Sequence, residues 1–133
     1  MSDRFWDKKN KFINGFLKEY NNWILEVNYR QHTLGCYIIL CKRNIEKITD
    51  LTVEELVELK FVMKETETAL LINEQFKPDR FNYMQLGNAM HNLHFHGVPR
   101  YESQRVFDNK IWIDSSYGNV FTFAKEGATD DLV

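Results

Sequence analysis

Three of the four histidines of this chain lie within six consecutive residues, and their spacing suits catalysis. Side chains of a β-strand alternate between the two faces of its sheet, so a strand here places Asn92, His94 and His96 on one face. Leu93 and Phe95 then point to the opposite face and pack on a core. Two imidazoles held side by side on a strand suit nucleophilic or metal chemistry near neutral pH. The pattern therefore predicts an active site on this strand.

Metal binding is the competing interpretation of the same histidines. Alternate histidines on a strand suit zinc, which needs a third and usually a fourth ligand. Neither the acids nor the two cysteines, Cys36 and Cys41, show a matching spacing, so we expect no metal site. The cysteines lie five residues apart in an apolar run and point to opposite faces of a strand, which excludes a disulfide between them. A reducing compartment is the simplest interpretation.

The composition limits the other classes of function. With 133 residues, 44% hydrophobic and 27% charged, the chain is typical of one globular domain, which we expect to span residues 1–133. A net charge of −2 favours no nucleic acid polymer as partner. No apolar segment approaches the length of a membrane span, and the first residues lack the apolar core of a signal peptide. We therefore expect a cytoplasmic protein without a membrane partner.

Hydrophobic periodicity predicts the elements that position the histidines. A capping box, Thr52-Val53-Glu54-Glu55, opens a helix over residues 53–75, whose apolar stripe should pack on the core. Pro99 should end the last strand, because proline has no N–H to donate. Strands are expected at 23–28, 35–42, 80–86 and 91–98, an amphipathic N-terminal helix within 1–20, and a turn between short extended pieces at 106–112. This order predicts an α+β fold, an antiparallel sheet with a long helix on one face, with a core at 23–101, an extension at 102–133 and a loose tail at 128–133.

The segment Asn92-Leu93-His94-Phe95-His96-Gly97-Val98-Pro99-Arg100-Tyr101 resembles the signature of the histidine-triad (HIT) superfamily of nucleotide hydrolases and transferases. In that signature three histidines stand at alternate positions and are followed by apolar residues, often ending in Pro-Arg-Tyr. The upstream landmarks also occur in the family's order: Trp23–Asn28, Leu34-Gly35, Lys42-Arg43, Asp50–Glu55, Phe81–Tyr83 and Gly87-Asn88. The chain is similar to the branch that contains diadenosine polyphosphate hydrolases.

The resemblance implies a fold, a reaction and a set of site residues. The family fold is a five-stranded antiparallel sheet with helices, usually in a homodimer. The middle histidine, His94 here, attacks an α-phosphate and forms a nucleotidyl-histidine intermediate, and His96 lies beside the developing charge. Asn88 matches a residue that contacts phosphate, and Asn28 matches one near the ribose. Expected substrates are dinucleoside polyphosphates or nucleoside phosphoramidates; no cofactor is required, and magnesium is possible with a polyphosphate.

The chain departs from the family pattern at the first triad position. Asn92 stands there, and an asparagine can orient a phosphate by hydrogen bonding but cannot donate a proton as imidazolium does. Asn44 and Cys36 replace two other family histidines. Arg100 either steers the anionic substrate or is a solvated or interface charge, and His32 is expected at the surface. Two alternatives to the enzyme follow, a nucleotide-sensing module with little turnover and a mainly structural dimer.

Overall fold

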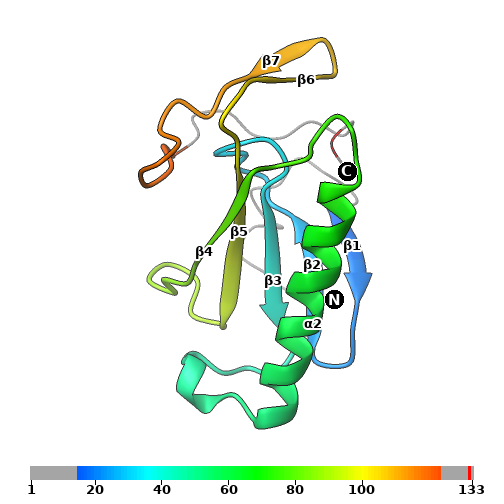
Figure 1. Cartoon of the computed structure of the whole chain (residues 1–133). Coiled ribbons are helices and arrows are strands. Elements are labelled where there is room, and N and C mark those ends of the chain that lie inside the picture. Colours follow the sequence, from blue (N-terminus) through cyan, green and yellow to red (C-terminus); the bar gives the residue numbers. More distant parts are fainter. Residues whose placement is uncertain (1–14, 124–131, 133) are drawn as a thin grey trace.

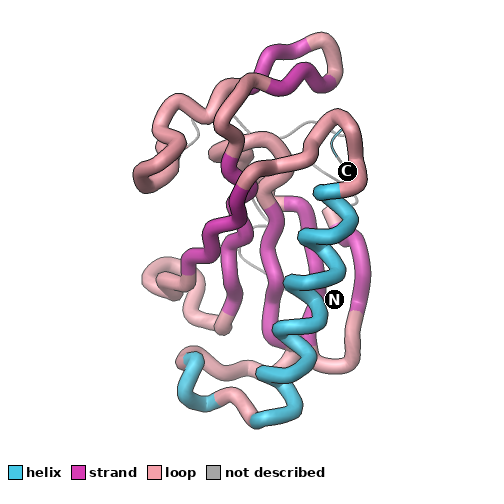
Figure 2. The backbone as a smooth tube through the Cα atoms, viewed as in Figure 1, coloured by secondary structure: helices cyan, strands magenta, loops and turns pink. Residues whose placement is uncertain are grey.

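A five-stranded antiparallel sheet with the long helix α2 (Val53–Leu71) across one face forms the body of the described chain (Figures 1 and 2). The structure is a computed structural model, and it describes residues 15–123 and 132. The strands lie in the order β1-β2-β3-β5-β4. Their bounds are β1 Phe16–Glu19, β2 Trp23–Val27, β3 Tyr37–Cys41, β4 Arg80–Met84 and β5 His94–Arg100, and the helix is α2, Val53–Leu71. The predicted α+β class with a helix on one face is confirmed.

The register of the central strands separates the core from the histidines. Ile39 of β3 pairs with Leu25 of β2 and Phe95 of β5, and all three belong to the buried cluster under α2 together with Trp23, Leu59 and Val62. The neighbouring positions Ile38 and Leu40 pair with His96 and His94 and face the other side of the sheet. The predicted alternation of apolar and imidazole side chains on this strand is thus present.

Helix α2 begins with the predicted capping box and ends earlier than predicted. The Thr52 side chain accepts a hydrogen bond from the Glu55 N–H, and the Glu55 carboxylate accepts one from the Thr52 N–H. The helix ends at Leu71 rather than residue 75, because the Asn73 side chain accepts from the backbone N–H of Gln75 and starts a turn. Of the predicted stripe, Leu59 and Val62 are buried and Met63 and Leu70 partly so, whereas Leu56 and Leu71 are exposed.

Glu55 also anchors the start of the helix to the sheet. Arg43 donates from Nε and Nη2 to the two Glu55 carboxylate oxygens at 2.8 and 2.9 Å, and the Glu55 carbonyl accepts from the Trp23 indole. The hydrogen bonds from Arg43, with the backbone N–H of Thr52, lower the pKa of Glu55 from 4.5 to about 2.

The lowered pKa predicts how stability depends on pH. Because the folded-state pKa lies below the ordinary value, the Glu55 carboxylate stabilises the fold above pH 4.5, and this contribution is lost as the pH falls toward 2. We expect Glu55→Gln to flatten the decline of the unfolding free energy in this range, measured by urea denaturation at several pH values. An unchanged slope in the variant would show that other carboxylates cause the decline.

The predicted N-terminal helix is wrong where the structure describes the segment. Residues 16–19 form β1, which pairs with β2 through Phe16–Glu26 and Lys18–Leu25. Pairing with an otherwise open edge of the sheet outweighs the helical spacing of Phe16 and Leu17, because tertiary context overrides local propensity. The earlier part of the predicted helix lies outside the described residues.

Pro99 does not end β5, contrary to the prediction. The strand continues to Arg100, and Pro99 pairs with Phe81 of β4. The Pro99 carbonyl accepts from the Thr33 hydroxyl on the other side of the strand. The N and C=O groups of one strand residue point the same way, so the absent N–H faces the loop before β3 and no bond to β4 is lost.

Gly97 is required by a close approach of an aromatic ring across the sheet. A Cβ built at this position would lie 2.2 Å from Cε2 of Tyr37, the residue with which Gly97 pairs. The Tyr37 hydroxyl is in turn hydrogen-bonded to Tyr83 at 2.6 Å. The glycine after His96 therefore lets the ring of Tyr37 approach the backbone of β5 closely.

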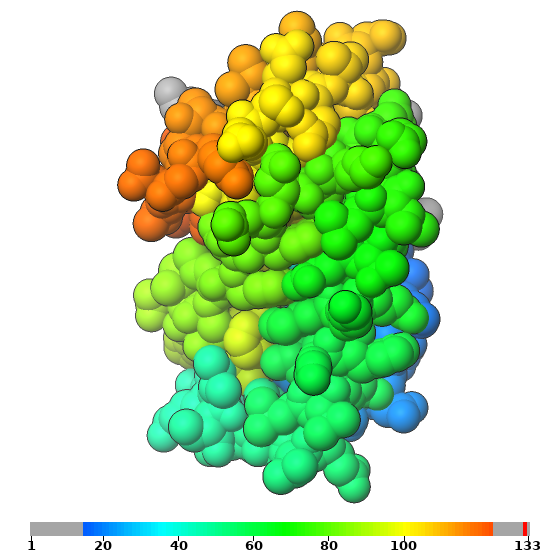
Figure 3. All heavy atoms as spheres, viewed as in Figure 1, coloured from blue at the N-terminus to red at the C-terminus, as the bar shows by residue number. Residues whose placement is uncertain are grey.

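The chain after β5 forms a hairpin and a loop that return to the sheet. β6 (Arg105–Phe107) and β7 (Lys110–Trp112) pair around Asp108 and Asn109, whose positive φ angles of 55° and 59° are those of a two-residue hairpin turn. This confirms the predicted turn at 106–112. The hairpin caps one end of the molecule in Figure 3, above the α2 face. Of the predicted tail, only Leu132 is described, and it packs on Leu34, Phe76 and Tyr101.

Candidate active site

A pocket of about 260 Å³ lies on the sheet face opposite α2, where the triad segment was predicted to work. It is formed by β5, the adjoining β3, the loop from β2 to β3, and the loop from β4 to β5. Its lining residues are Asn28, Tyr29, Arg30, His32, Ile38, Leu86, Gly87, Asn88, Ala89, Met90, His94 and His96. Four of the predicted site residues therefore share one pocket: His94, His96, Asn28 and Asn88.

His94 is held in one neutral tautomer. Its Nδ1 lies 2.7 Å from the Asn92 carbonyl; a carbonyl only accepts hydrogen bonds, so Nδ1 carries the proton and Nε2 carries the lone pair. The side chain is buried, and burial lowers the pKa of His94 below its usual value. The ring is therefore neutral at pH 7, with its lone pair on the nitrogen opposite the anchored one.

His96 lies beside His94 and is oriented by Asn28. The two rings are edge to face, with centroids 5.0 Å apart. The Asn28 side-chain amide is 3.5 Å from Nδ1 of His96; its NH₂ group donates and Nδ1 accepts, which leaves the proton of His96 on Nε2. Burial, with smaller effects from His94 and His32, lowers the pKa of His96 to about 4. Both triad imidazoles are thus neutral. Nε2 carries a lone pair in His94 and an N–H donor in His96.

The charge of the pocket suits an anion. Among the described residues of the lining, Arg30 is the only formally charged one, and none of them is Asp or Glu. Asn88 lies exposed on the loop from β4 to β5, next to Gly87, whose φ of +71° lets the chain turn there. A phosphate entering this pocket meets amide and imidazole donors and one cation.

Asn92 acts through its backbone rather than at the pocket surface. Its side chain donates to the Cys41 carbonyl at 2.9 Å, at the end of β3, and it is not among the lining residues. Its own carbonyl holds Nδ1 of His94. The geometry therefore gives Asn92 the role of orienting the His94 ring, in place of the predicted phosphate contact.

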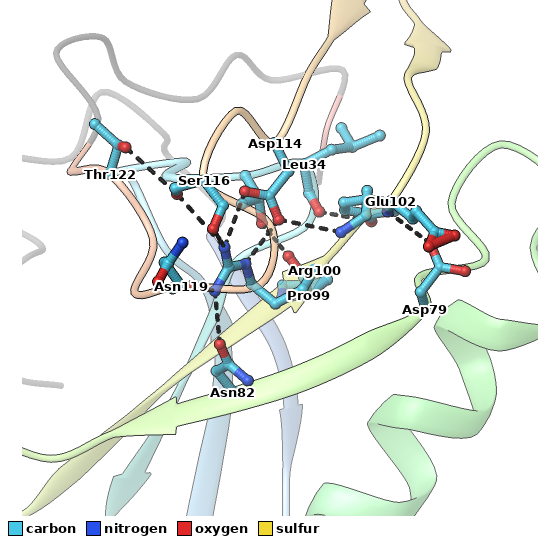
Figure 4. Close-up of polar contacts among 12 residues, drawn as sticks. Leu34, Asp79, Asn82, Pro99, Arg100, Glu102, Asp114, Ser116, Asn119 and Thr122 are labelled. Atoms are coloured by element: carbon cyan, nitrogen blue, oxygen red, sulfur yellow. Dashed lines mark hydrogen bonds and ion pairs between the residues drawn. The ribbon is translucent and has the colours of Figure 1, made fainter.

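Arg100 is committed to the protein and lies away from the pocket. Its Nε and Nη2 form a bidentate pair with Asp114 at 2.7 and 3.1 Å, and both side chains are almost fully buried. The remaining donors bond to the Asn82 side chain and to the carbonyls of Ser116 and Asn119 (Figure 4). These contacts match the five N–H donors of a guanidinium. The predicted steering of substrate by Arg100 is therefore replaced by anchoring of the C-terminal loop.

The sequence analysis did not assign His32 or Arg30 to the pocket. His32, expected at the surface, lines the pocket and is half-buried, with its ring stacked on Phe121 at 5.0 Å. Arg30 lies on the same loop. The available signal was local: the polar segment 29–33 follows the predicted ribose residue Asn28, and its basic and aromatic side chains are the kind that line nucleotide sites.

Among residues 15–123 and 132, no group of three or more His, Cys, Asp or Glu side chains is arranged to hold a metal ion. No helix in this part of the chain, α2 included, is long and apolar enough to cross a membrane.

The fold and the paired imidazoles on β5 define a class of protein, and comparison with known proteins identifies it. The HIT domain family model matches residues 26–103, so the chain belongs to the HIT domain family. No curated protein matches this sequence.

Solved structures share the fold at low sequence identity. A HIT family protein from Bacillus anthracis superposes with a TM-score of 0.61 at 20% identity, over 76% of this chain and 75% of that one. A hypothetical histidine triad nucleotide-binding protein from Sulfolobus tokodaii gives 0.63 at 19%, over 96% and 80%. A zinc-bound histidine triad family protein from Mycobacterium smegmatis gives 0.58 at 19%, over 66% of each chain. At these identities the likeness concerns the fold alone.

Proposed function

We propose that this protein is a nucleotide hydrolase or nucleotidyl transferase that acts on the α-phosphate of a nucleoside phosphate adduct through a nucleotidyl-histidine intermediate. The observation that carries the proposal is the state of His94. Its Nδ1 proton is fixed by the Asn92 carbonyl, and its lone pair lies on Nε2 in a pocket whose described lining residues include no acidic side chain. This is the arrangement that a histidine nucleophile for phosphorus requires.

The reaction proceeds in two displacements at phosphorus. Nε2 of His94 forms a bond to the α-phosphorus as the bond to the leaving group breaks, and the leaving group departs with the electron pair. The proton stays on Nδ1 and is donated in a hydrogen bond to the Asn92 carbonyl, which stabilises the positive charge that develops on the ring. Water then attacks the same phosphorus as the bond to Nε2 breaks, and the electron pair of that bond returns to Nε2 as neutral His94. The nucleoside monophosphate keeps one hydrogen of the water, and the other leaves to solvent as a proton.

The remaining pocket groups hold the phosphate oxygens during this transfer. His96 offers its Nε2–H, Asn88 its side-chain amide, and Arg30 its positive charge. Preorganised donors aimed at developing charge provide much of the rate acceleration in such sites. Magnesium, where present, would enter as part of a polyphosphate substrate.

The need to protonate the leaving group differs between the two expected substrate classes and favours dinucleoside polyphosphates. An amine leaving group must be protonated as it departs, whereas a nucleoside di- or triphosphate leaves as a stable anion. Burial lowers the pKa of all three pocket histidines, and Asn92 supplies no acid at the first triad position. We therefore propose dinucleoside polyphosphates, of which a diadenosine polyphosphate is the simplest probe, ahead of phosphoramidates.

The test is release of nucleoside monophosphate from a diadenosine polyphosphate and from an adenosine phosphoramidate, followed by chromatography. We expect release from both, faster from the polyphosphate. His91→Ala is a matched control, because His91 is exposed and is not among the lining residues, and it should retain full activity. If the wild-type protein released nucleoside monophosphate from neither substrate, the proposed reaction would be contradicted.

A nucleotide-sensing module is the second candidate, and the missing acid at residue 92 is the observation that favours it. Such a protein would bind nucleotide in the same pocket and turn over slowly or not at all. A rise in melting temperature with nucleotide, without release of product, would establish it. A structural dimer predicts neither result.

Assembly as a homodimer in the cytoplasm completes the proposal. Cys36 and Cys41 are both buried and unbridged, which fits a reducing compartment. β4 is an edge strand of the sheet, and an edge strand is able to pair with a second copy. Sedimentation velocity measures the mass in solution; a monomer at all concentrations would exclude the dimer.

A further inference from the structure

We propose that His32, with its ring held by Phe121 and Phe123 of the C-terminal extension, is the surface against which the nucleobase stacks. The inference rests on the proposed function, because it takes the α-phosphate to lie at His94. It adds a specificity-determining residue and gives the extension a role in the site.

The ring of His32 forms an aromatic wall with two phenylalanines. It is nearly parallel to Phe121, with centroids 5.0 Å apart and an interplanar angle of 24°, and it is tilted against Phe123 at 5.2 Å. The two phenylalanines also contact each other at 5.6 Å. Of the three, only His32 lines the pocket, so Phe121 and Phe123 are positioning residues behind it. A ring supported by two others loses little freedom when a ligand stacks on it.

The extension is anchored so that this wall has a defined position. Phe121 is buried against Cys36, Val98 and Met84 on the pocket face of the sheet. The preceding loop is fixed by the bidentate pair of Arg100 with Asp114 and by the other bonds of this guanidinium to the loop backbone (Figure 4). These loop residues lie outside the matched family domain, residues 26–103. The wall therefore combines a loop of the domain with a segment beyond it.

The order of groups along the pocket places a base at this wall. His94 is adjacent to His96, and His96 is hydrogen-bonded to Asn28. The loop that follows Asn28 carries Tyr29 and His32 into the same lining. With a phosphate at His94, a nucleoside that extends along the pocket past His96 and Asn28 brings its base to this loop. Burial and the charge of Arg30 lower the pKa of His32 to about 4, so the ring is neutral and offers an aromatic face rather than a cation.

The experiment compares ligands with and without a base. Binding of adenosine monophosphate and of ribose 5-phosphate to the full chain is measured by calorimetry, for the wild type, His32→Leu and His32→Phe. Base stacking on a side-chain ring is typically large enough that we expect His32→Leu to weaken adenosine monophosphate on the order of tenfold. Ribose 5-phosphate should bind unchanged, and His32→Phe should bind adenosine monophosphate like the wild type.

A second variant tests the supporting ring without disturbing the core. Phe123 is 62% exposed, so Phe123→Leu should fold normally while it removes one aromatic contact from His32. We expect a smaller loss of adenosine monophosphate affinity, about threefold, and again no change for ribose 5-phosphate. Phe123→Tyr keeps the ring and should restore the affinity.

Three results would overturn the inference. The His32→Leu variant could lose affinity equally for both ligands, it could lose affinity for neither, or the His32→Phe variant could bind adenosine monophosphate more weakly than the wild type. These outcomes are separate from failure of the proposed function. If the expected binding pattern is found but the wild type releases no product, the stacking proposal holds and the proposed reaction fails. If the wild type releases product but His32→Leu binds both ligands normally, the proposed reaction holds and the stacking proposal fails.

Discussion

Replacing His94 with alanine should lower turnover of a diadenosine polyphosphate on the order of 10³-fold or more. The substitution removes the atom that bonds to phosphorus, and the remaining donors provide only positioning and charge stabilisation. Affinity for adenosine monophosphate should change little, since His96, Asn88 and Arg30 still line the pocket. Single-turnover kinetics and calorimetry measure the two effects separately.

His91→Ala is the control for this experiment, because it removes an imidazole three residues away that is exposed and outside the pocket. Its turnover should equal that of the wild type. Retention of activity by His94→Ala, or an equal loss in both variants, would assign the chemistry to another group.

Replacing Asp114 with alanine should destabilise the fold by about 3–5 kcal/mol, a large fraction of the stability of a domain of this size. The Asp114 carboxylate and Arg100 guanidinium side chains are 2% and 3% exposed. Removing the carboxylate leaves a buried charge without its partner, and the backbone N–H of Tyr101 loses an acceptor. Urea denaturation, followed by circular dichroism, measures the change.

Glu74→Ala is the matched control for Asp114. It also removes an acid from an ion pair, but the Glu74 side chain is 85% exposed and 3.6 Å from Lys77. Such a pair contributes at most about 1 kcal/mol. If Asp114→Ala costs no more than Glu74→Ala, the Arg100 cluster does not hold the extension to the sheet.

Much of the fold was predictable because local patterns and tertiary packing agree in the core. The strands around Trp23, Ile39 and Phe95 and the helix that begins at Thr52 follow from apolar spacing and a capping box, and all are present. The predictions failed where a partner decides the conformation. Phe16–Glu19 becomes a strand because it pairs with β2, and Pro99 stays in β5 because its N atom faces a loop.

The site was predictable to the extent that it lies on one strand. Alternation alone placed His94 and His96 on the face opposite the core, and the family resemblance added Asn28 and Asn88. Contacts between distant segments were not predictable from spacing. The stacking of His32 on Phe121 joins residues 89 positions apart, and the exposed-looking Arg100 is buried by a loop that follows it.

The central claim is that His94 becomes covalently nucleotidylated during turnover. The most direct measurement is intact-protein and peptide mass spectrometry of wild-type protein mixed with a diadenosine polyphosphate and quenched in alkali within the first turnover. The account predicts an adenylyl adduct that maps to His94 and is absent from His94→Ala. Product release without any adduct at this time, or an adduct on another residue, would contradict it.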